Sequence, residues 1–503
     1  MSAVPKELLN LDRVKIDPAW ALRVPQALAT RRKVLPFAAL NNRVYVACLS
    51  EQDSAALQAV QRYVKLPVVA QAAEPASLDR ALARVFANAP LSLQAQGSPQ
   101  PGGPRGAADS RNPETDDTAV SLCDELLYAA ILRQASDIHI DPDHDGVEIR
   151  FRVDGVLESY RRLPTEAHGG MLSRFKVLSE MDIAEKRAPQ DGRFTHRLGT
   201  GGQEIDIRTA TLPTRHGERM TLRLLALSTS ALTLERLGML DRDLGIFQTA
   251  LDKPHGMILL TGPTGSGKTT TLYAAVRRLI GRESLNVITI EDPVEYDIAG
   301  VAQVEVDSAD KVSFGKALRS VLRHDPDVVM IGEIRDQETA DVAIKAALTG
   351  HLVFSTLHTN SAASAVTRLA DMGVERFLIA ATLRLSVAQR LVRSLCSHCR
   401  KPHELTTSEA AALRRPELAG RTTFEPAGCM YCAGRGFTGR LGLFEMMPVD
   451  ETLSRMIAEG AEEARLLEFM RESHLPRLLD DALEKLWNGD ASLRDVLSAV
   501  TEW

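Results

Sequence analysis

The segment Gly262–Thr269, with sequence GPTGSGKT, constrains the fold of this chain more than any other feature. It satisfies the pattern G-x-x-x-x-G-K-[ST], in which glycines let successive backbone N–H groups turn inward around phosphates. The pattern requires a strand before the loop and a helix after it. Both are expected here, because apolar MILL precedes the loop and TTTLYAAVRRLI follows it. A fortuitous glycine-rich turn is the alternative, and it does not explain this context.

The chemistry of the loop assigns a role to its last residues. Lys268 is expected to place its charge near the β- and γ-phosphates, and the Thr269 hydroxyl is expected to bind Mg²⁺. ATP and Mg²⁺ are therefore the expected cofactors. The residues predicted to bind the nucleotide are Gly262, Pro263, Thr264, Gly265, Ser266, Gly267, Lys268, Thr269 and Thr270.

A second apolar segment, Val328–Ile331, runs into Gly332 and Glu333. Phosphate-binding-loop folds place an acidic residue at the end of such a strand, where it polarises water or holds the metal. Gly332 occupies the usual aspartate position, so Glu333 is expected to carry the acidic role. The direct ligands of Mg²⁺ stay open, and an acid that only caps a helix is the alternative.

The chain around these motifs alternates short apolar strands with helices from about Leu240 onward, which predicts a parallel sheet. The expected strands are Met257–Leu260, Val287–Ile290, Val328–Ile331 and Leu352–Ser355. A helical tail is expected at the end of the chain, with pieces at Leu453–Ala458 and Glu463–Arg471.

The N-terminal half is predicted to hold two further folded parts separated by a linker. Residues 94–117 are rich in Pro, Gly, Ser and Asp and lack aromatic residues, so they cannot bury enough surface to order themselves. Residues 1–93 read as a small α/β module, with a strand at Arg43–Cys48 and a helix at Leu78–Phe86.

The stretch after the linker is β-rich. It opens with a helix at Thr118–Leu132, and strict alternation over Gly146–Asp154 predicts a strand that ends in an Asp154-Gly155 hairpin turn. Glu204–Thr211 and Glu218–Leu225 repeat the alternation. Arg208 and Arg223 lie on the polar faces of these two strands.

Four of the six cysteines form two C-x-x-C pairs, Cys396–Cys399 and Cys429–Cys432. Four thiolates suit one structural, tetrahedral Zn²⁺ with no open position for chemistry. Residues 401–428 between the pairs can fold as an insertion, and His398 is expected to be a bystander. Two labile disulfides are the alternative.

Composition limits the partners. A formal net charge of −6 gives no global attraction for nucleic acid, and aromatic residues make up 5%, so we expect no nucleic-acid partner. The N-terminus lacks the pattern of a secretory signal, and the chain offers no run of apolar residues of membrane-spanning length. We therefore expect a cytoplasmic protein that reaches the inner membrane through partners.

Four segments, in this order along the chain, resemble the secretion and pilus-assembly ATPases, the family of general secretory pathway protein E. They are GPTGSGKTT, ITIEDPVEY at Ile288–Tyr296, LRHDPDVVMIGEIRD at Leu322–Asp336, and TGHLVFSTLHTNSA at Thr349–Ala362. The resemblance extends from about Leu122 to the end of the chain.

The resemblance implies further site residues. Glu291 and Glu295 would organise the attacking water or Mg²⁺, and His351 and His358 would sense the γ-phosphate. Arg208 and Arg223 would reach the γ-phosphate from the preceding domain, in the manner of arginine fingers. For the two histidines the alternative is a purely structural role. For the two arginines the alternative is that they form a solvated polar face on their strands.

The resemblance also implies a multidomain α/β fold. Its parts are an N-terminal docking module (1–93), a linker (94–117), a β-rich, PAS-like domain (118–236), a RecA-like P-loop ATPase domain (237–395), an inserted tetracysteine zinc module (396–432) and a helical C-terminal region (433–503).

The implied function is a homo-hexameric motor whose ATP hydrolysis powers pseudopilus assembly in type II secretion. The alternative within the class is type IV pilus extension. A nucleotide-binding scaffold without turnover is the alternative from another class, and Lys268, Thr269 and Glu333 argue against it. The expected partners are a platform protein of the inner membrane and the cytoplasmic domain of the platform's L protein, which the N-terminal module would bind.

Overall fold

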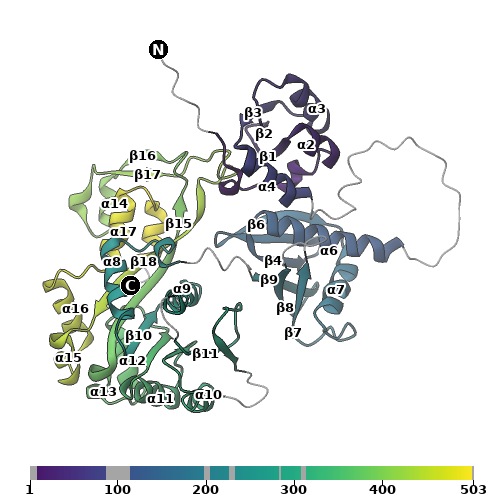
Figure 1. Cartoon of the computed structure of the whole chain (residues 1–503). Coiled ribbons are helices and arrows are strands. Elements are labelled where there is room, and N and C mark those ends of the chain that lie inside the picture. The colour runs from purple at the N-terminus through teal and green to yellow at the C-terminus, as the bar shows by residue number, and fades with distance from the viewer. Residues whose placement is uncertain are drawn as a thin grey trace. The chain divides into compact units, whose positions relative to one another are not determined.

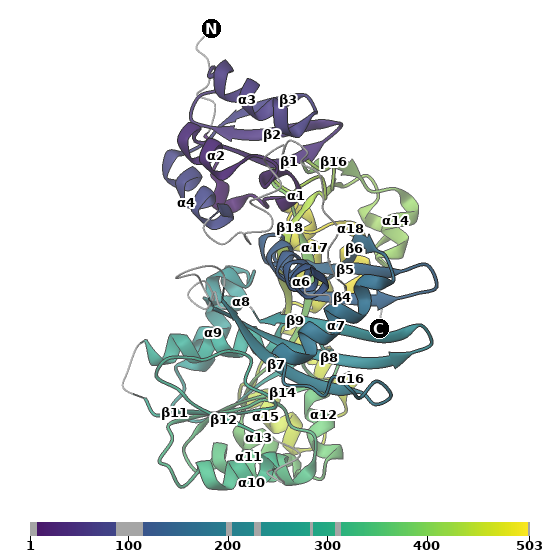
Figure 2. The ribbon, with the colours of Figure 1, turned by 90° about the vertical axis from the view of Figure 1, so that its right-hand side faces the viewer.

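The structure is a computed structural model that describes residues 8–86, 114–197, 204–225, 233–281, 285–306 and 313–500. These residues form two compact units, each described below by itself (Figures 1 and 2). The first unit holds the described residues up to 225 together with 398–400 and 426–438. The second holds those from 233 to 397, 401–425 and 439–500. Within the described part of the chain, no helix is long and apolar enough to cross a membrane.

The second unit is built on a seven-stranded sheet with the order β12-β11-β13-β14-β10-β15-β18. All four predicted strands are confirmed within it, and β10 pairs in parallel with both β14 and β15. The strands are β10 (Gly256–Thr261), β11 (Val287–Glu291), β12 (Ala302–Glu305), β13 (Val328–Ile331), β14 (Leu352–Leu357), β15 (Leu383–Leu395) and β18 (Phe437–Pro448).

Helices cover both faces of this sheet, because the strand residues alternate between two apolar cores. Ile258 and Leu260 pack with the core of α8 (Asp241–Leu251) and α9 (Lys268–Ile280), beside the 3₁₀ helix η4 (Leu234–Arg236). Met257 and Leu259 pack on the opposite face. The helices of that second core are α10 (Phe314–Val321), α11 (Gln337–Leu348), α12 (Ser364–Asp371), α13 (Arg376–Thr382), α15 (Glu451–Ala458) and α16 (Glu463–Glu472).

The C-terminal region forms a smaller core of its own, made by α17 (Leu478–Trp487), α18 (Leu493–Val500) and the segment between the cysteine pairs. The predicted insertion between those pairs is folded. It contains β16 (Lys401–Glu404), α14 (Thr407–Ala412), the 3₁₀ helix η5 (Pro416–Leu418) and β17 (Thr422–Glu425), and β16 pairs antiparallel with β17. The predicted helices of the tail correspond to α15 and α16.

The first unit begins with a three-stranded sheet, β1-β2-β3, in which the predicted strand and helix are β2 and α4. Its elements are η1 (Leu11–Arg13), α1 (Pro18–Ala21), α2 (Gln26–Arg32), β1 (Val34–Leu40), β2 (Arg43–Cys48), α3 (Ser54–Val64), β3 (Val68–Ala72) and α4 (Pro75–Phe86). Most of the predicted linker lies outside the described residues. The helix after it, α6 (Glu114–Leu132), begins four residues before the expected Thr118.

The β-rich part of the first unit is a six-stranded sheet with the order β6-β5-β4-β9-β8-β7. Its elements are β4 (Ala135–Pro142), β5 (Val147–Val153), β6 (Val156–Leu163), α7 (Glu166–Leu178), β7 (Gln190–Arg197), β8 (Glu204–Thr214) and β9 (Gly217–Leu225). Positive φ angles of 51° at Asp154 and 85° at Gly155 confirm the predicted hairpin turn between β5 and β6. Apolar residues of α6, α7 and alternate strand positions share one core, so the charged residues gather on the opposite face.

Candidate functional site

A polar pocket of about 480 Å³ lies where strands β11, β13 and β14 end, in front of the loop that precedes α9. Residues 264–270 of the predicted phosphate-binding loop line it. The lining includes four carboxylates, Glu291, Asp292, Glu295 and Glu333. Carboxylates with the Thr269 hydroxyl form an oxygen-donor set of the kind that Mg²⁺ prefers, so the residues present fit a magnesium–nucleotide complex.

Two glycines of the loop are required by close approach as well as by backbone angle. Gly262 has a φ of 148°, and a Cβ there would lie 2.5 Å from the carbonyl oxygen of Gln389. Gly267 has a φ of 90°, and its Cβ would lie 2.9 Å from Nε2 of Gln389. Because Gly267 is the N-cap of α9, the loop delivers the helix N-terminus directly to the pocket.

Lys268 is 8% exposed, and its ammonium group donates hydrogen bonds to the carbonyl oxygens of Gly262 (2.7 Å) and Pro263 (3.0 Å). Burial lowers the pKa of Lys268 to about 8, with the charge of Arg390 acting in the same direction and that of Glu333 opposing it. A phosphate group would supply the negative charge that this site lacks next to the ammonium.

Glu333 lines the pocket and is held between two basic side chains. Its Oε2 lies 3.0 Å from Nε2 of His358, and its Oε1 forms an ion pair with Arg335. Arg335 also reaches Asp292 at 3.5 Å. Two separately predicted site residues, Glu333 and His358, are therefore brought together by β13 and β14, which are neighbours in the sheet.

Glu291 lines the pocket, as its predicted role requires, and side chains of the protein hold its carboxylate. It is 2% exposed, and its Oε1 accepts hydrogen bonds from Thr289 Oγ1 (2.6 Å) and Gln303 Nε2 (3.0 Å). Its Oε2 accepts a hydrogen bond from the hydroxyl of Tyr273. Both oxygens of Glu291 are thus engaged by protein donors, as both oxygens of Glu333 are, and its role toward the water or Mg²⁺ stays a prediction. Glu295 is exposed and lines the pocket, as the predicted role requires.

His351 lies at the opposite end of β14 from the pocket. It precedes Leu352, which pairs with Gly256 at the start of β10, whereas the phosphate-binding loop follows the end of β10. Its Nδ1 lies 2.9 Å from the carbonyl oxygen of Ala346. His351 is therefore not among the residues that line the nucleotide pocket of this chain. Its contact with Ala346 fits a structural histidine, which was the alternative to a role in sensing phosphate.

Arg208 and Arg223 lie in the first unit, directly opposite each other on β8 and β9. Arg193 of β7 lies opposite Arg208, so three arginines follow one another across three strands on one face. Asp137 balances this row at one end, with its Oδ1 3.0 Å from Nε of Arg223. Three guanidinium groups therefore lie in one row on this face of the sheet.

Sequence reasoning missed three residues that belong to this description. Arg440 of β18 lines the pocket. Gln389 of β15 accepts a hydrogen bond from Thr271 (2.9 Å) and supports the loop from behind. Arg193 extends the arginine row. The polar pair Gln389-Arg390 within the largely apolar segment LSVAQRLV, residues 385–392, is the sequence signal that could have indicated Gln389.

The four predicted cysteines come together, with their sulfur atoms within 4.8 Å of one another. The Cys432 sulfur lies 3.8 Å from those of Cys399 and Cys429. A tetrahedral zinc with bonds of about 2.3 Å to sulfur would place its ligands about 3.8 Å apart. Burial raises the pKa of Cys432, but the N–H groups of Cys429 and Gly436 bond to its sulfur and bring that pKa below its usual value. The arrangement therefore fits a structural zinc.

The chain matches known protein families along most of its length. Residues 113–498 match the family described as "Type II/IV secretion system protein", and residues 6–90 match the MshEN domain. The type II secretion system protein E of Pseudomonas aeruginosa is 40% identical over 490 residues, which covers 95% of this chain and 96% of the relative. The type IV pilus assembly ATPase PilB of Myxococcus xanthus is 43% identical over 385 residues, covering 76% of this chain and 68% of the relative.

Solved structures agree with the family match. The pilus retraction motor PilT with bound ADP covers 75% of this chain and 98% of its own, at 27% identity and a TM-score of 0.53. The ATPase DotB of Legionella pneumophila covers 76% of this chain and 96% of its own, at 22% identity and a TM-score of 0.57, and supports the fold alone.

The parallel sheet, the phosphate-binding loop and Glu333 define a RecA-like P-loop ATPase. The chain belongs to the type II/IV secretion system protein family. ATP hydrolysis coupled to secretion is the activity of this class.

Proposed function

We propose that this chain is the hexameric ATPase motor of a type II secretion system and that it powers pseudopilus assembly. The observation that supports this assignment is the match to a type II secretion E protein along nearly the whole of both chains, 95% and 96%. Type IV pilus assembly is the second candidate, favoured by the 43% identity to a pilus assembly ATPase.

In the proposed reaction Lys268 and the N–H groups of the loop would bind the β- and γ-phosphates, and Thr269 would hold Mg²⁺ with help from the carboxylates of the pocket. The bound ion would neutralise charge on the phosphate oxygens. Glu333 would orient the attacking water and accept a proton from it, because its carboxylate lines the same pocket as Lys268. His358 and Arg335 hold that carboxylate in place. Glu295 adds a second acidic group.

Arg208 and Arg223 are proposed to compensate the charge that develops on the γ-phosphoryl group. Both belong to the unit that precedes the ATPase unit in the chain, so their contribution requires that unit to meet a nucleotide pocket. Their place in a row of three arginines supports this role, because it concentrates positive charge on one face of the sheet.

Zn²⁺ is the metal that we propose for Cys396, Cys399, Cys429 and Cys432. The sulfur separations support it, and a filled set of four thiolates leaves no position for catalysis. The metal would tie the two cysteine pairs together at the base of the folded insertion between them. Its role is therefore structural.

The N-terminal module is proposed to dock on the cytoplasmic domain of the platform's L protein, and so to hold the motor at the inner membrane. The match to a discrete MshEN domain at residues 6–90 supports a separate binding module. Deleting residues 1–90 should leave basal ATP hydrolysis and abolish recruitment. Membrane fractionation tests this, and a truncated protein that still sediments with its platform would contradict it.

Deletion of the gene for this chain distinguishes the two candidate systems. We expect extracellular protease activity to fall to background while twitching motility is unchanged, with a strain carrying Lys268→Ala showing the same defect. Loss of twitching with normal protease secretion would contradict the assignment and favour the pilus.

A further inference from the structure

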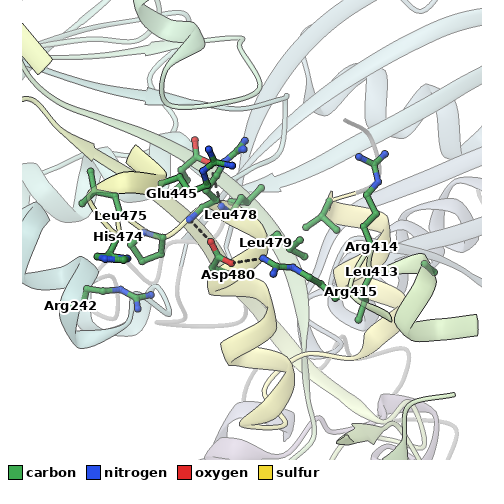
Figure 3. Close-up of a pocket in the computed structure, with 15 residues that line it drawn as sticks. Arg242, Leu413, Arg414, Arg415, Glu445, His474, Leu475, Leu478, Leu479 and Asp480 are labelled. Carbon is green, nitrogen blue, oxygen red and sulfur yellow. Dashed lines mark hydrogen bonds and ion pairs between the residues drawn. The ribbon is translucent and has the colours of Figure 1, made fainter. Parts of the chain in front are cut away.

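A second pocket, of about 700 Å³, lies in the C-terminal region of the second unit (Figure 3). None of its lining residues lines the nucleotide pocket. It is formed by the turn after α14, the segment that leads into α17, the end of α18 and single residues of α8, α16 and β18. The proposed ATPase mechanism makes no use of it.

The floor of this pocket is apolar. Leu413 and Leu478 are buried there, and Leu475, Pro476, Leu479 and Val500 are partly buried around them. Partly exposed leucines around a pocket can bind an apolar side chain of another molecule and so remove it from water.

The rim of the pocket is cationic. Five exposed arginines surround the floor, and they come from four separate segments of the chain: Arg242, Arg414, Arg415, Arg471 and Arg477. Two carboxylates, those of Glu445 and Asp480, also line the pocket. The rim therefore has an excess of positive charge.

Both carboxylates already serve the fold. Glu445 is 2% exposed and accepts hydrogen bonds from the backbone N–H groups of Ala362 (2.8 Å) and Leu478 (3.3 Å). Asp480 accepts one from the N–H of Arg477 (3.0 Å) at the start of α17, and Figure 3 shows it facing Arg415. They are positioned by these contacts and are not available to neutralise the whole rim.

The ion pairs of the rim arginines are long. Arg242 lies 3.3 Å from Asp243 and 3.4 Å from Glu484. Arg415 lies 3.5 Å from Asp480, and Arg471 lies 3.7 Å from Glu468. A charge-assisted bond between a guanidinium and a carboxylate is ordinarily about 2.7–2.9 Å long. These guanidinium groups therefore keep donors for a further carboxylate.

We propose that this pocket docks a segment of a partner protein in which carboxylates flank an apolar side chain. The apolar side chain would occupy the leucine floor, and the carboxylates would pair with the arginine rim. Arginine is enriched at protein interfaces for this reason. The positive charge of the rim calls for acidic groups on the partner, and the apolar floor calls for an apolar side chain between them.

Two other kinds of ligand fit the pocket less well. No phenylalanine, tyrosine or tryptophan is among its lining residues within the described chain, so no aromatic ring is present to stack on a nucleotide base. An anionic membrane attracts clustered basic residues on an outward-facing surface, whereas these arginines surround a hollow. A protein segment is the ligand that uses both the floor and the rim.

The test uses the full chain and two dye-labelled synthetic peptides, DELLDELFED and KKLLKKLFKK, in fluorescence anisotropy titrations. We expect the acidic peptide to bind at least about tenfold more tightly than the basic one, and its affinity to fall with added salt. The double variant Arg414→Glu with Arg471→Glu should weaken the acidic peptide by about tenfold or more. Leu479→Asp should also weaken it, because the floor loses its apolar character.

The matched control is Arg455→Glu with Arg494→Glu, which reverses two exposed arginines outside the pocket. It should bind the acidic peptide as the wild type does, and all variants should keep the wild-type rate of ATP hydrolysis. Equal weakening by both double variants would overturn the proposal, as would equal affinity for the two peptides. Binding to phosphatidylglycerol vesicles that is lost in the rim variant, with no peptide binding, would also overturn it and identify a lipid site.

Discussion

Replacing Tyr273 with phenylalanine removes one hydroxyl group from beneath the nucleotide pocket. That hydroxyl donates to the buried carboxylate of Glu291 and accepts the backbone N–H of Glu295 at 3.3 Å. A hydrogen bond to a charged group contributes about 1.5–3 kcal/mol, and one between neutral groups contributes about 0.5–1.5 kcal/mol. The free energy of unfolding of the ATPase unit should therefore fall by roughly 2–4 kcal/mol.

The chain supplies a matched control for this change in Tyr296. Its ring packs edge-on against Tyr273 with centroids 4.4 Å apart, but its buried hydroxyl has no hydrogen-bond partner within the described residues. Tyr296→Phe should consequently change the stability little. Both substitutions remove the same atom from neighbouring rings, so the difference between them isolates the hydrogen bonds.

Thermal unfolding followed by circular dichroism measures the difference. At about 2–4 °C per kcal/mol for a unit of this size, Tyr273→Phe should lower the melting temperature of the ATPase unit by roughly 5–15 °C. Tyr296→Phe should stay close to the wild type. Equal melting temperatures for the two variants would refute the view that Tyr273 fixes Glu291 in the wall of the pocket.

Three further predictions concern the metal, the arginines and the lysine. Cys432→Ser should release zinc, as measured by elemental analysis, and should leave ATP affinity unchanged; wild-type protein purified without chelator and free of metal would contradict this. Arg208→Ala and Arg223→Ala should each lower kcat more than ATP affinity, by up to about 10³–10⁵ for a full arginine finger, and a raised KM with unchanged kcat in steady-state assays would exclude that role. Because the pKa of Lys268 is lowered to about 8, its charge is lost as the pH rises through that value, so ATP affinity should fall there by equilibrium titration. An affinity that stays constant across this range would contradict the assignment of Lys268.

Much of the ATPase unit could be predicted because its signals are local. The strands that carry the site are short apolar runs, and the loop and Glu333 follow two of them directly. The contact between Glu333 and His358 joins residues that end neighbouring strands of the sheet. Local sequence motifs can therefore indicate both of these site residues.

The residues that sequence reasoning missed are brought in by distant strands. Gln389 reaches Thr271 across 118 positions of the chain, and Arg440 enters the pocket from β18. Glu291 is a further case, because its motif predicts the acidic group but not the three side-chain donors that hold its carboxylate. Such assignments depend on tertiary packing, which no local pattern specifies.

The most direct test of the account is the rate of phosphate release by Glu333→Gln, measured beside its affinity for ATP. The account predicts a turnover lower by about 10²–10⁴-fold with ATP affinity retained, since Lys268 and the loop are intact. Glu338→Gln is the matched control, because it makes the same change at an exposed glutamate that pairs with Arg319 outside the pocket, and it should hydrolyse ATP like the wild type. Wild-type turnover by Glu333→Gln would contradict the claim that this carboxylate activates the water.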